Sequence, residues 1–377
     1  RSRGLGDVYK RQVSDLFSLA SASSLAESYF KQVLETFSQG GLSDWKSRTQ
    51  ALGSFTSIRD SGESDSFKEK VAVTLFQIML KQAGRDYNDS KAADYKTYRM
   101  GEKAVETLLG TDGISGGNIT TWSRDIRTKN GGSISITAPG GGLTLANTAA
   151  SIIPIEPFSK KGSPSGGNAL ALPPGIVTAA GGAINIFTDK SVDLGIGRIF
   201  TLRGGDIMIW SDRGDIAAGS SAKTVASAPP TRVLIDPQSA SVLTDLAGLA
   251  TGGGIGVLAA IPGVPVGNVD LIAPTGVIDA GDAGIRSTGN LNLAATKILN
   301  ADNILAGGVT VGAPPPAAPS APPAAAPPPA APPAGATAAA AAGNSAAENA
   351  ANNNKSAETE QPPSIISVEV LGYGGGD

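Results

Sequence analysis

The residues best suited to chemistry lie in one short stretch, where Arg203 and Arg213 flank Asp206, Asp212 and Asp215. Two carboxylates on one face could act as general acid and base on a polysaccharide, with a guanidinium stabilising the developing negative charge. Each aspartate, however, lies beside or within a glycine-rich turn, where a carboxylate commonly accepts hydrogen bonds from backbone N–H groups. Related copies of the same motif hold Asn118, Asn268 and Asn290 at the position of Asp206. The pattern therefore favours turn capping over catalysis.

A second acidic group, Asp270, Asp279 and Asp282, suggests calcium ligands. The Gly-Gly-x-Gly-x-Asp pattern of calcium-binding β-rolls is absent, so turn capping is again preferred. The chain contains no cysteine and no histidine. Thiolate zinc sites, disulfides and the commonest general base are therefore excluded. We expect no metal site, no cofactor and no catalytic residue.

The elements that must position these residues are short strands. A motif of glycine followed by alternating polar and aliphatic residues occurs six times. Side chains two apart on a strand share a face, so each copy predicts a strand with one apolar and one polar face. Strands repeated in this way predict a solenoid, in which each coil buries its apolar face against its neighbours. The second residue after each glycine forms an expected column of Ile119, Ile134, Ile184, Ile207, Val269 and Leu291.

The fifth residue after the glycine is aromatic in three copies, Trp122, Phe187 and Trp210. Three aromatic rings in one column could form a strip that stacks against sugars. They could also pack beneath loops or helices, which is the preferred interpretation because an exposed Trp is costly. Tyr95 and Tyr98 are expected to be core or interface residues of the helical region.

The chain before the repeats has helical periodicity. Residues 66–84 place apolar side chains three or four apart and end on Gly84, the expected C-cap. Residues 94–109 and 25–37 are further candidates. Residues 1–12 resemble a non-native leader and are set aside. The predicted organisation is a non-native leader (1–12), a helical subdomain (13–112), a parallel β-helix (113–312), an Ala/Pro-rich linker (313–363) and a C-terminal strand with a glycine-rich end (364–377).

The linker and the loops interrupt the strand pattern. Residues 313–363 are rich in Ala and Pro and hold few aliphatic or aromatic residues, which predicts a disordered spacer. Long loops are expected at 151–175 and 226–265. We expect the strand that follows the linker to pair with the open last coil of the solenoid.

Three segments resemble the C-terminal conserved region of the filamentous haemagglutinin family of large exported bacterial proteins. They are Gly204–Gly219, Gly131–Gly142 and Val269–Arg286, and the end at Ser364–Gly374 is also similar. The resemblance covers about 95–377. It implies a right-handed β-helix, export by a two-partner route through an outer-membrane secretion pore, and display as an adhesin at the cell surface or in the medium.

The expected function is thus structural and adhesive, with surface glycans or receptors of the host or of other bacteria as partners. A net charge of −3 gives no support to nucleic-acid binding, and no apolar stretch is long enough to span a membrane. The alternative is a carbohydrate-active β-helix enzyme, which would need Asp and Arg residues converging in an acidic cleft. A toxin-tipped relative would need a compact charged domain after the solenoid, where this chain has a linker and one strand.

Overall fold

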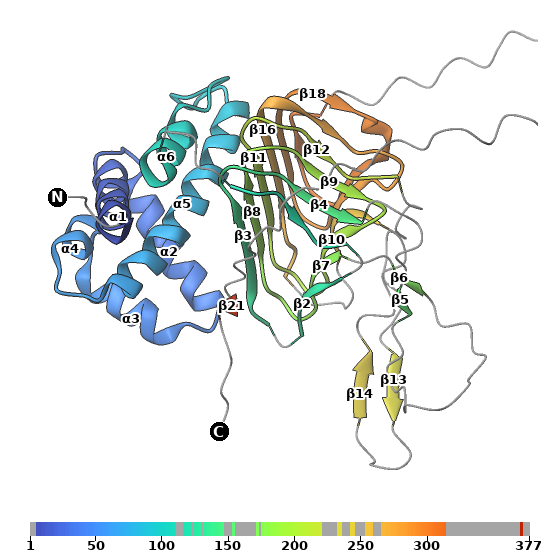
Figure 1. Ribbon diagram of the computed structural model, residues 1–377, viewed down its shortest axis with the longest axis horizontal. Helices are drawn as coiled ribbons and strands as arrows, with labels where there is room; N and C mark the ends of the chain where they lie inside the picture. The colour runs from blue at the N-terminus through green and yellow to red at the C-terminus, as the bar shows by residue number, and fades with distance from the viewer. Residues whose placement is uncertain are drawn as a thin grey trace, which may run out of the picture. The chain divides into compact units, whose positions relative to one another are not determined.

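The computed structural model describes residues 5–110, 116–122, 124–129, 131–146, 153–154, 171–172, 175–220, 232–235, 242–245, 253–258, 265–313 and 370–371. Helices occupy the N-terminal part, and most of the described strands that follow belong to two mainly parallel sheets (Figure 1). The helices are α1 (Leu5–Ser21), α2 (Ala26–Gln39), α3 (Ser43–Leu52), α4 (Phe55–Asp60), α5 (Asp65–Asn88) and α6 (Arg99–Leu109).

The helical prediction is confirmed in outline and corrected in detail. Helix α2 matches the expected segment 25–37, whereas α6 begins at Arg99 rather than at Asp94. Helix α1 begins at Leu5, inside the segment that was set aside as a non-native leader. Helix α5 continues through Gly84 to Asn88, so Gly84 is not its C-cap. A Cβ atom at Gly84 would lie 2.3 Å from Ile272 Cγ1, and close packing against a strand therefore explains this glycine.

The strands form three stacks, and paired strands within each stack run parallel. The first stack contains β3 (Ser133–Ala138), β8 (Ile184–Thr188), β11 (Ile207–Ser211), the first parts of β16 (Val269–Asp279) and β18 (Leu291–Leu299), and β20 (Thr310–Val311). The second contains β1 (Ile119–Thr120), β4 (Leu143–Ala146), β9 (Val192–Gly195), β12 (Ile216–Ala217) and the last parts of β16 and β18. The third contains β2 (Ile126–Thr128), β7 (Gly175–Thr178), β10 (Arg198–Thr201), β15 (Gly254–Val257), β17 (Ile285–Ser287) and β19 (Ile304–Ala306).

The chain visits these stacks in a fixed order. From β8 it passes to β9 and then β10, and the next glycine turn returns it to β11 in the first stack. Strands β16 and β18 each run through the first and second stacks before β17 and β19 enter the third. Each circuit therefore lays one strand beside its counterpart from the previous circuit.

The predicted column is confirmed for five of the six copies. Ile134 pairs with Ile184, Ile184 with Ile207, Ile207 with Val269, and Val269 with Leu291. The prediction is wrong for the copy that begins at Gly117, because Ile119 pairs with Leu143 in the second stack. A short aliphatic strand has the same pattern in either stack, so the glycine motif alone does not specify which stack a strand joins.

The interior of the circuits is a continuous aliphatic cluster. Its members come from all three stacks and are almost completely buried, among them Ile184, Ile207, Leu271 and Ile285. Three strands of the third stack, β2, β7 and β10, each end in a threonine: Thr128, Thr178 and Thr201. Each threonine hydroxyl donates a hydrogen bond to the backbone carbonyl of the glycine four residues later, in the turn. Side-chain hydroxyls thus satisfy the turns that return the chain to the first stack.

The strand β21 (Val370–Leu371) is antiparallel to β3, with Val370 opposite Ile134 and Leu371 opposite Ser133. The expectation that it would pair with the last coil is wrong, since β3 belongs to the first stack at its opposite end. Two short antiparallel pairs, β5 (Ile153–Pro154) with β6 (Ala171–Leu172) and β13 (Arg232–Ile235) with β14 (Val242–Asp245), fall within the predicted loops. Strand β15 of the third stack also lies within the predicted loop 226–265, so the loop prediction is wrong for Gly254–Val257. Most of the remaining loop residues and nearly all of the linker lie outside the described residues.

Candidate functional site

Helix α5 lies along the outer face of the first stack (Figure 1). Polar side chains on one stripe of the helix contact successive strands. Gln77 Nε2 donates to Ser135 Oγ at 2.8 Å, and Lys81 Nζ lies 3.6 Å from Asp206 Oδ2. The helix rises about 17 Å from Gln77 to Asn88. The first stack rises about 19 Å from β3 to β18. Because the helix segment and the stack have similar lengths, α5 can contact every strand from β3 to β18.

Arg85 and Asp270 form the most buried polar contact of this interface. The Arg85 Nε and Nη2 atoms each donate to one Asp270 carboxylate oxygen at 2.8 Å, which is a bidentate pair. The Asp270 side chain is 1% exposed and the Arg85 side chain is 39% exposed. Burial raises the pKa of Asp270 above its ordinary value, and the hydrogen bonds from Arg85 oppose this shift. The aspartate thus depends on the arginine for its charge balance, whereas the arginine can still reach water.

Two glycines bring the helices close to the strands. Besides Gly84 in α5, Gly101 in α6 lies so close to Trp210 that a Cβ would be 2.4 Å from its Cη2 atom. The Trp210 ring is fully buried and packs edge-on against Tyr98 with 6.0 Å between ring centroids. Phe187 packs in the same manner on Phe76 at 5.5 Å. Helices and strands therefore share one hydrophobic cluster.

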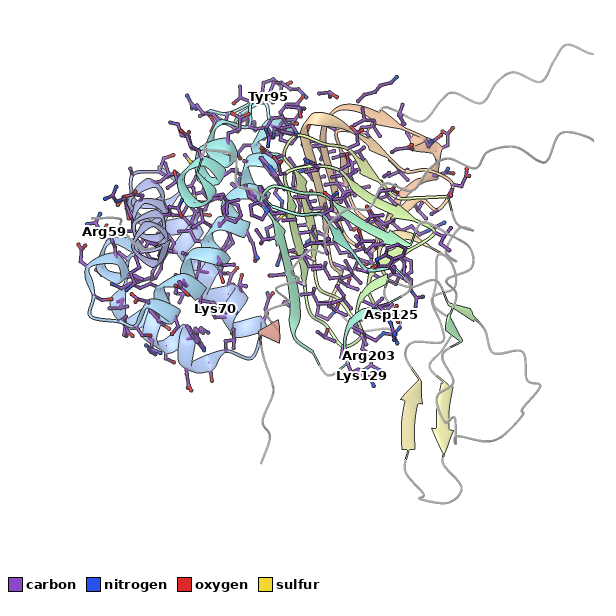
Figure 2. The ribbon with its side chains drawn as sticks, in the orientation of Figure 1. Arg59, Lys70, Tyr95, Asp125, Lys129 and Arg203 are labelled. Atoms are coloured by element: carbon purple, nitrogen blue, oxygen red, sulfur yellow. The ribbon has the colours of Figure 1, made fainter. Side chains whose placement is uncertain are left out.

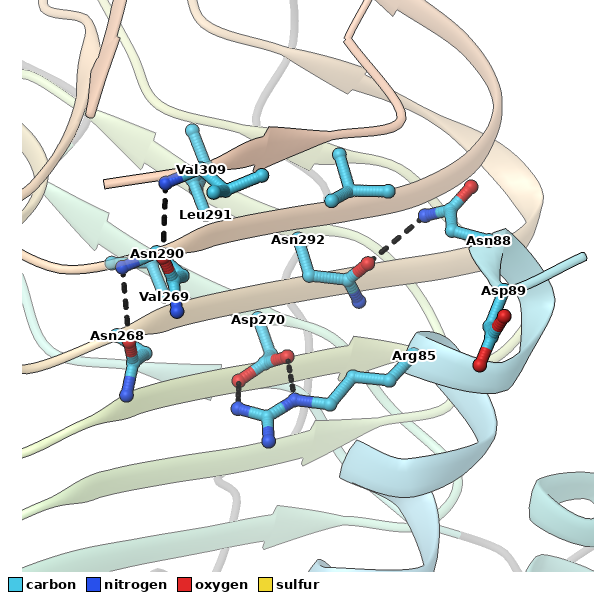
Figure 3. Close-up of a pocket in the computed structure, with 11 residues that line it drawn as sticks. Arg85, Asn88, Asp89, Asn268, Val269, Asp270, Asn290, Leu291, Asn292 and Val309 are labelled. Atoms are coloured by element: carbon cyan, nitrogen blue, oxygen red, sulfur yellow. Dashed lines mark hydrogen bonds and ion pairs between the residues drawn. The ribbon is translucent and has the colours of Figure 1, made fainter. Parts of the chain in front are cut away.

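A pocket of about 500 Å³ lies where α5 ends over β16, β18 and β20 (Figure 3). Arg85, Asn88 and Asp89 form the helical side. Asn88 Nδ2 donates to Asn292 Oδ1 at 3.0 Å and to the Leu293 carbonyl at 2.9 Å. The strands contribute amide and aliphatic groups: Asn268, Val269, Asp270, Asn290, Leu291, Asn292, Val309 and Val311. The pocket is thus lined by amides, one ion pair and valines.

Amide and carboxylate side chains form a ladder at the corner that precedes the first stack (Figure 3). Asp206 Oδ1 accepts from the backbone N–H of Asn268, and Asn268 Oδ1 accepts from that of Asn290, both at 2.9 Å. Asn290 Oδ1 in turn accepts from the N–H of Val309. Asn118 Oδ1 makes an equivalent bond to the N–H of Gly142. The predicted turn-capping role of these residues is therefore confirmed.

The structure does not bring the candidate catalytic residues together. Asp206 precedes β11 and Asp212 follows it, so they are separated by about 20 Å of extended strand. Asp212 accepts from Trp210 Nε1 at 3.1 Å, and burial raises its pKa above the ordinary value. Asp215 Oδ1 accepts from the N–H of Val277 at 2.8 Å. Each carboxylate thus has a structural partner.

The two arginines of the candidate group are also separated. Arg213 forms a bidentate pair with Asp189, at 2.6 and 2.7 Å, in the turn of the neighbouring circuit. Arg203 follows β10, a strand of the third stack, and lies near Lys129 in Figure 2. The candidates thus divide into two groups, Arg203 with Asp206 in the turn before β11 and Asp212, Arg213 and Asp215 in the turn after it.

The aspartates of the suggested calcium site are likewise apart. Asp270 lies under α5 in the first stack, whereas Asp279 ends β16 in the second stack and accepts from the N–H of Gly281 and from Asn300 Nδ2. Asp282 is exposed in the following turn. Among the residues that the structure describes, no three acidic side chains group as a metal site would require.

The three aromatic residues of the predicted column differ in their exposure to solvent. Phe187 and Trp210 are 3% and 0% exposed beneath the helices, so the predicted docking role is confirmed for them. The packing prediction is wrong for Trp122, whose side chain is 70% exposed and whose copy of the motif lies in the second stack rather than in the first. Its φ is 52°. Tyr98 is buried in the interface as expected, whereas Tyr95 is 45% exposed at the surface of the helical region (Figure 2).

Sequence reasoning missed the polar stripe of α5. Gln77, Lys81, Arg85 and Asn88 recur at intervals of three or four residues, which places them on one helical face. That spacing was the available indication. It could not identify the strand residues that the stripe contacts, since these come from four separate circuits.

Comparison with known proteins bears on residues 204–315, which match a family model described as filamentous haemagglutinin family outer membrane protein. The matched region runs from the turn before β11 to the residues after β20. No curated protein and no solved structure gave a match. No helix in the described part of the chain is long and apolar enough to cross a membrane. The similarity to this family is therefore shown for residues 204–315, which make up less than half of the chain.

Proposed function

We propose that this chain is a structural and adhesive segment of a filamentous haemagglutinin-like protein, built as a right-handed parallel β-helix. The observation that carries the proposal is the in-register stacking of successive circuits over the same residues that match the family. A right-handed path is expected because connections between parallel strands are almost always right-handed. In such a fold each circuit is supported by its neighbours, which suits an extended stalk.

A surface or secreted location is supported by the family description of an outer membrane protein. We propose export by a two-partner route, with an outer-membrane secretion pore as one partner and surface glycans or receptors as the other. The absence of cysteine is compatible with export of an unfolded chain, because no disulfide has to be broken or reformed. The resemblance of 131–142 and 364–374 to the family extends the same inference beyond the matched residues.

A non-catalytic role is supported by what the acidic residues do. Asp206 holds a corner, Asp212 accepts from an indole, Asp215 caps a turn and Asp270 anchors a helix. A glycosidase needs two carboxyl groups about 5–10 Å apart across one bond. Asp206 and Asp212 are about twice as far apart along extended strand.

The test combines adhesion and cleavage. We expect the purified chain to bind epithelial cells or an array of surface glycans without releasing oligosaccharides from soluble polysaccharides. Asp206→Asn and Asp212→Asn should leave binding unchanged, because each retains an oxygen that can accept its hydrogen bond. Polysaccharide cleavage that either substitution abolishes would contradict the proposal, as would failure to bind any cell or glycan surface.

A further inference from the structure

The three strands at the β1–β3 end of the stacks differ in how much open edge they present. Strands β1 and β2 have two and three residues, whereas β3 has six. An open edge exposes a row of unpaired backbone N–H and C=O groups that can recruit another strand, and short edges carry less of this hazard. Strand β3 is therefore the edge at this end with the greatest capacity to recruit a strand.

The chain places its own C-terminal strand on this edge. Strand β21 pairs with β3, whose other neighbour is β8. The pairing is antiparallel, whereas each circuit lays its strand parallel to the previous one. An antiparallel strand cannot serve as a further circuit of the same path, so β21 terminates the stack rather than extends it. Val370 stands opposite Ile134, the first member of the buried column in the first stack.

We propose that the C-terminal strand is a cap that occupies the Ser133–Ile134 part of the β3 edge and prevents two copies of the chain from joining through that edge. An exposed β3 edge accepts an antiparallel strand, as β21 shows, and a two-fold related β3 from a second copy would present its edge in the same antiparallel sense. The partner that the cap excludes is thus a second copy of this chain.

The cap can be located by cross-linking, since the chain has no cysteine of its own. The full chain carrying S133C and L371C should form a disulfide within one molecule, because these residues face each other across the two strands. The matched variant T310C with L371C places the first cysteine on β20, at the other end of the first stack. Preferential cross-linking to position 310 would overturn the proposal.

The function of the cap is tested by V370P, because proline cannot donate to a strand ladder and disfavours pairing. In dilute, monomeric solution we expect faster hydrogen exchange at 133–134, the residues that pair with β21. At higher concentration we expect a monomer-to-dimer shift in sedimentation, with circular dichroism unchanged. The control A350P lies outside the strand and should behave as the unmodified chain. Unchanged exchange at 133–134 in dilute V370P would contradict the cap. A V370P chain that exchanges faster there but stays monomeric at high concentration would contradict the role of the cap in excluding a second copy.

Discussion

The interior of the circuits and the interface between the helices and the first stack are both largely buried, yet they are built differently. In the interior, the same contact recurs in each circuit: an aliphatic side chain packs against the aliphatic side chain of the neighbouring circuit. The interface uses single-copy features: two glycines, two aromatic pairs and one buried ion pair. A change in the interior should therefore cost a similar amount in every circuit, whereas a change in the interface should be costly only at particular positions.

The largest effect is expected for Trp210→Ala. Trp210 is fully buried between α6 and the strands, and its loss leaves a cavity that the surrounding rings cannot fill. We expect the free energy of unfolding to fall by about 3–5 kcal/mol in urea denaturation. Trp122→Ala is the control, because that side chain is 70% exposed, and it should change stability by less than about 0.5 kcal/mol. Equal costs for the two substitutions would contradict the description of the interface.

Removal of either partner of the Arg85–Asp270 ion pair should lower the free energy of unfolding by a different amount. Arg85→Ala leaves the buried Asp270 carboxylate without its partner and should cost about 3–5 kcal/mol. Asp270→Ala leaves an arginine that is 39% exposed and can be hydrated, so a cost of about 1–2 kcal/mol is expected. Urea denaturation of both single variants and the double variant measures the coupling. The same cost for both single substitutions would indicate that Asp270 is hydrated.

Gly84→Ala tests the close approach of α5 to β16. Alanine favours a helix over glycine, so a solvent-exposed site would gain stability. Here the new Cβ meets Ile272, and we expect a net loss of about 1–3 kcal/mol. At Gly62, by contrast, a Cβ would meet no atom within 4 Å, so Gly62→Ala should be nearly neutral. A stabilising effect at Gly84 in thermal denaturation would place the helix farther from the strand.

The corner ladder should be the mildest of the packing tests. Asn290→Ala removes the acceptor for the N–H of Val309, and a loss of about 0.5–1.5 kcal/mol is expected. Asn290→Asp retains an oxygen acceptor and should lose less. Hydrogen exchange at Val309 provides a direct measurement, since that amide should be the one that gains most in rate.

The smallest effect concerns pH. Burial raises the pKa of Asp212, so the folded protein retains a proton that the unfolded chain has already released. The stability contributed by this group therefore falls as pH rises from the ordinary aspartate value through the raised folded value. Asp212→Asn removes this fall, so the stability of the variant relative to the unmodified chain should rise with pH over that acidic window in urea titrations. A relative stability that falls with pH would show that the pKa is lowered rather than raised.

The same contrast explains what could be predicted from the sequence. Repetition made the buried column predictable, because Ile134, Ile184 and Ile207 occupy equivalent positions after a glycine. The Gly117 copy was misplaced because its two-residue strand carries too little pattern to specify a stack. Gly84 was misread as a helix end because a glycine that allows close packing and one that ends a helix look identical in sequence. Contacts such as Arg85 with Asp270 join distant parts of the chain and require the fold itself.

Because Trp210 joins the helices to the circuits in one hydrophobic cluster, we expect both parts to unfold together. The most direct measurement is urea unfolding of the Trp45→Phe, Trp122→Phe variant, in which Trp210 is the only tryptophan, followed by fluorescence and by circular dichroism at 222 nm. We predict one transition with the same midpoint for both signals, as expected when the interface and the helices are lost together. Exposure of Trp210 at a lower urea concentration, while the helical signal persists, would contradict the claim.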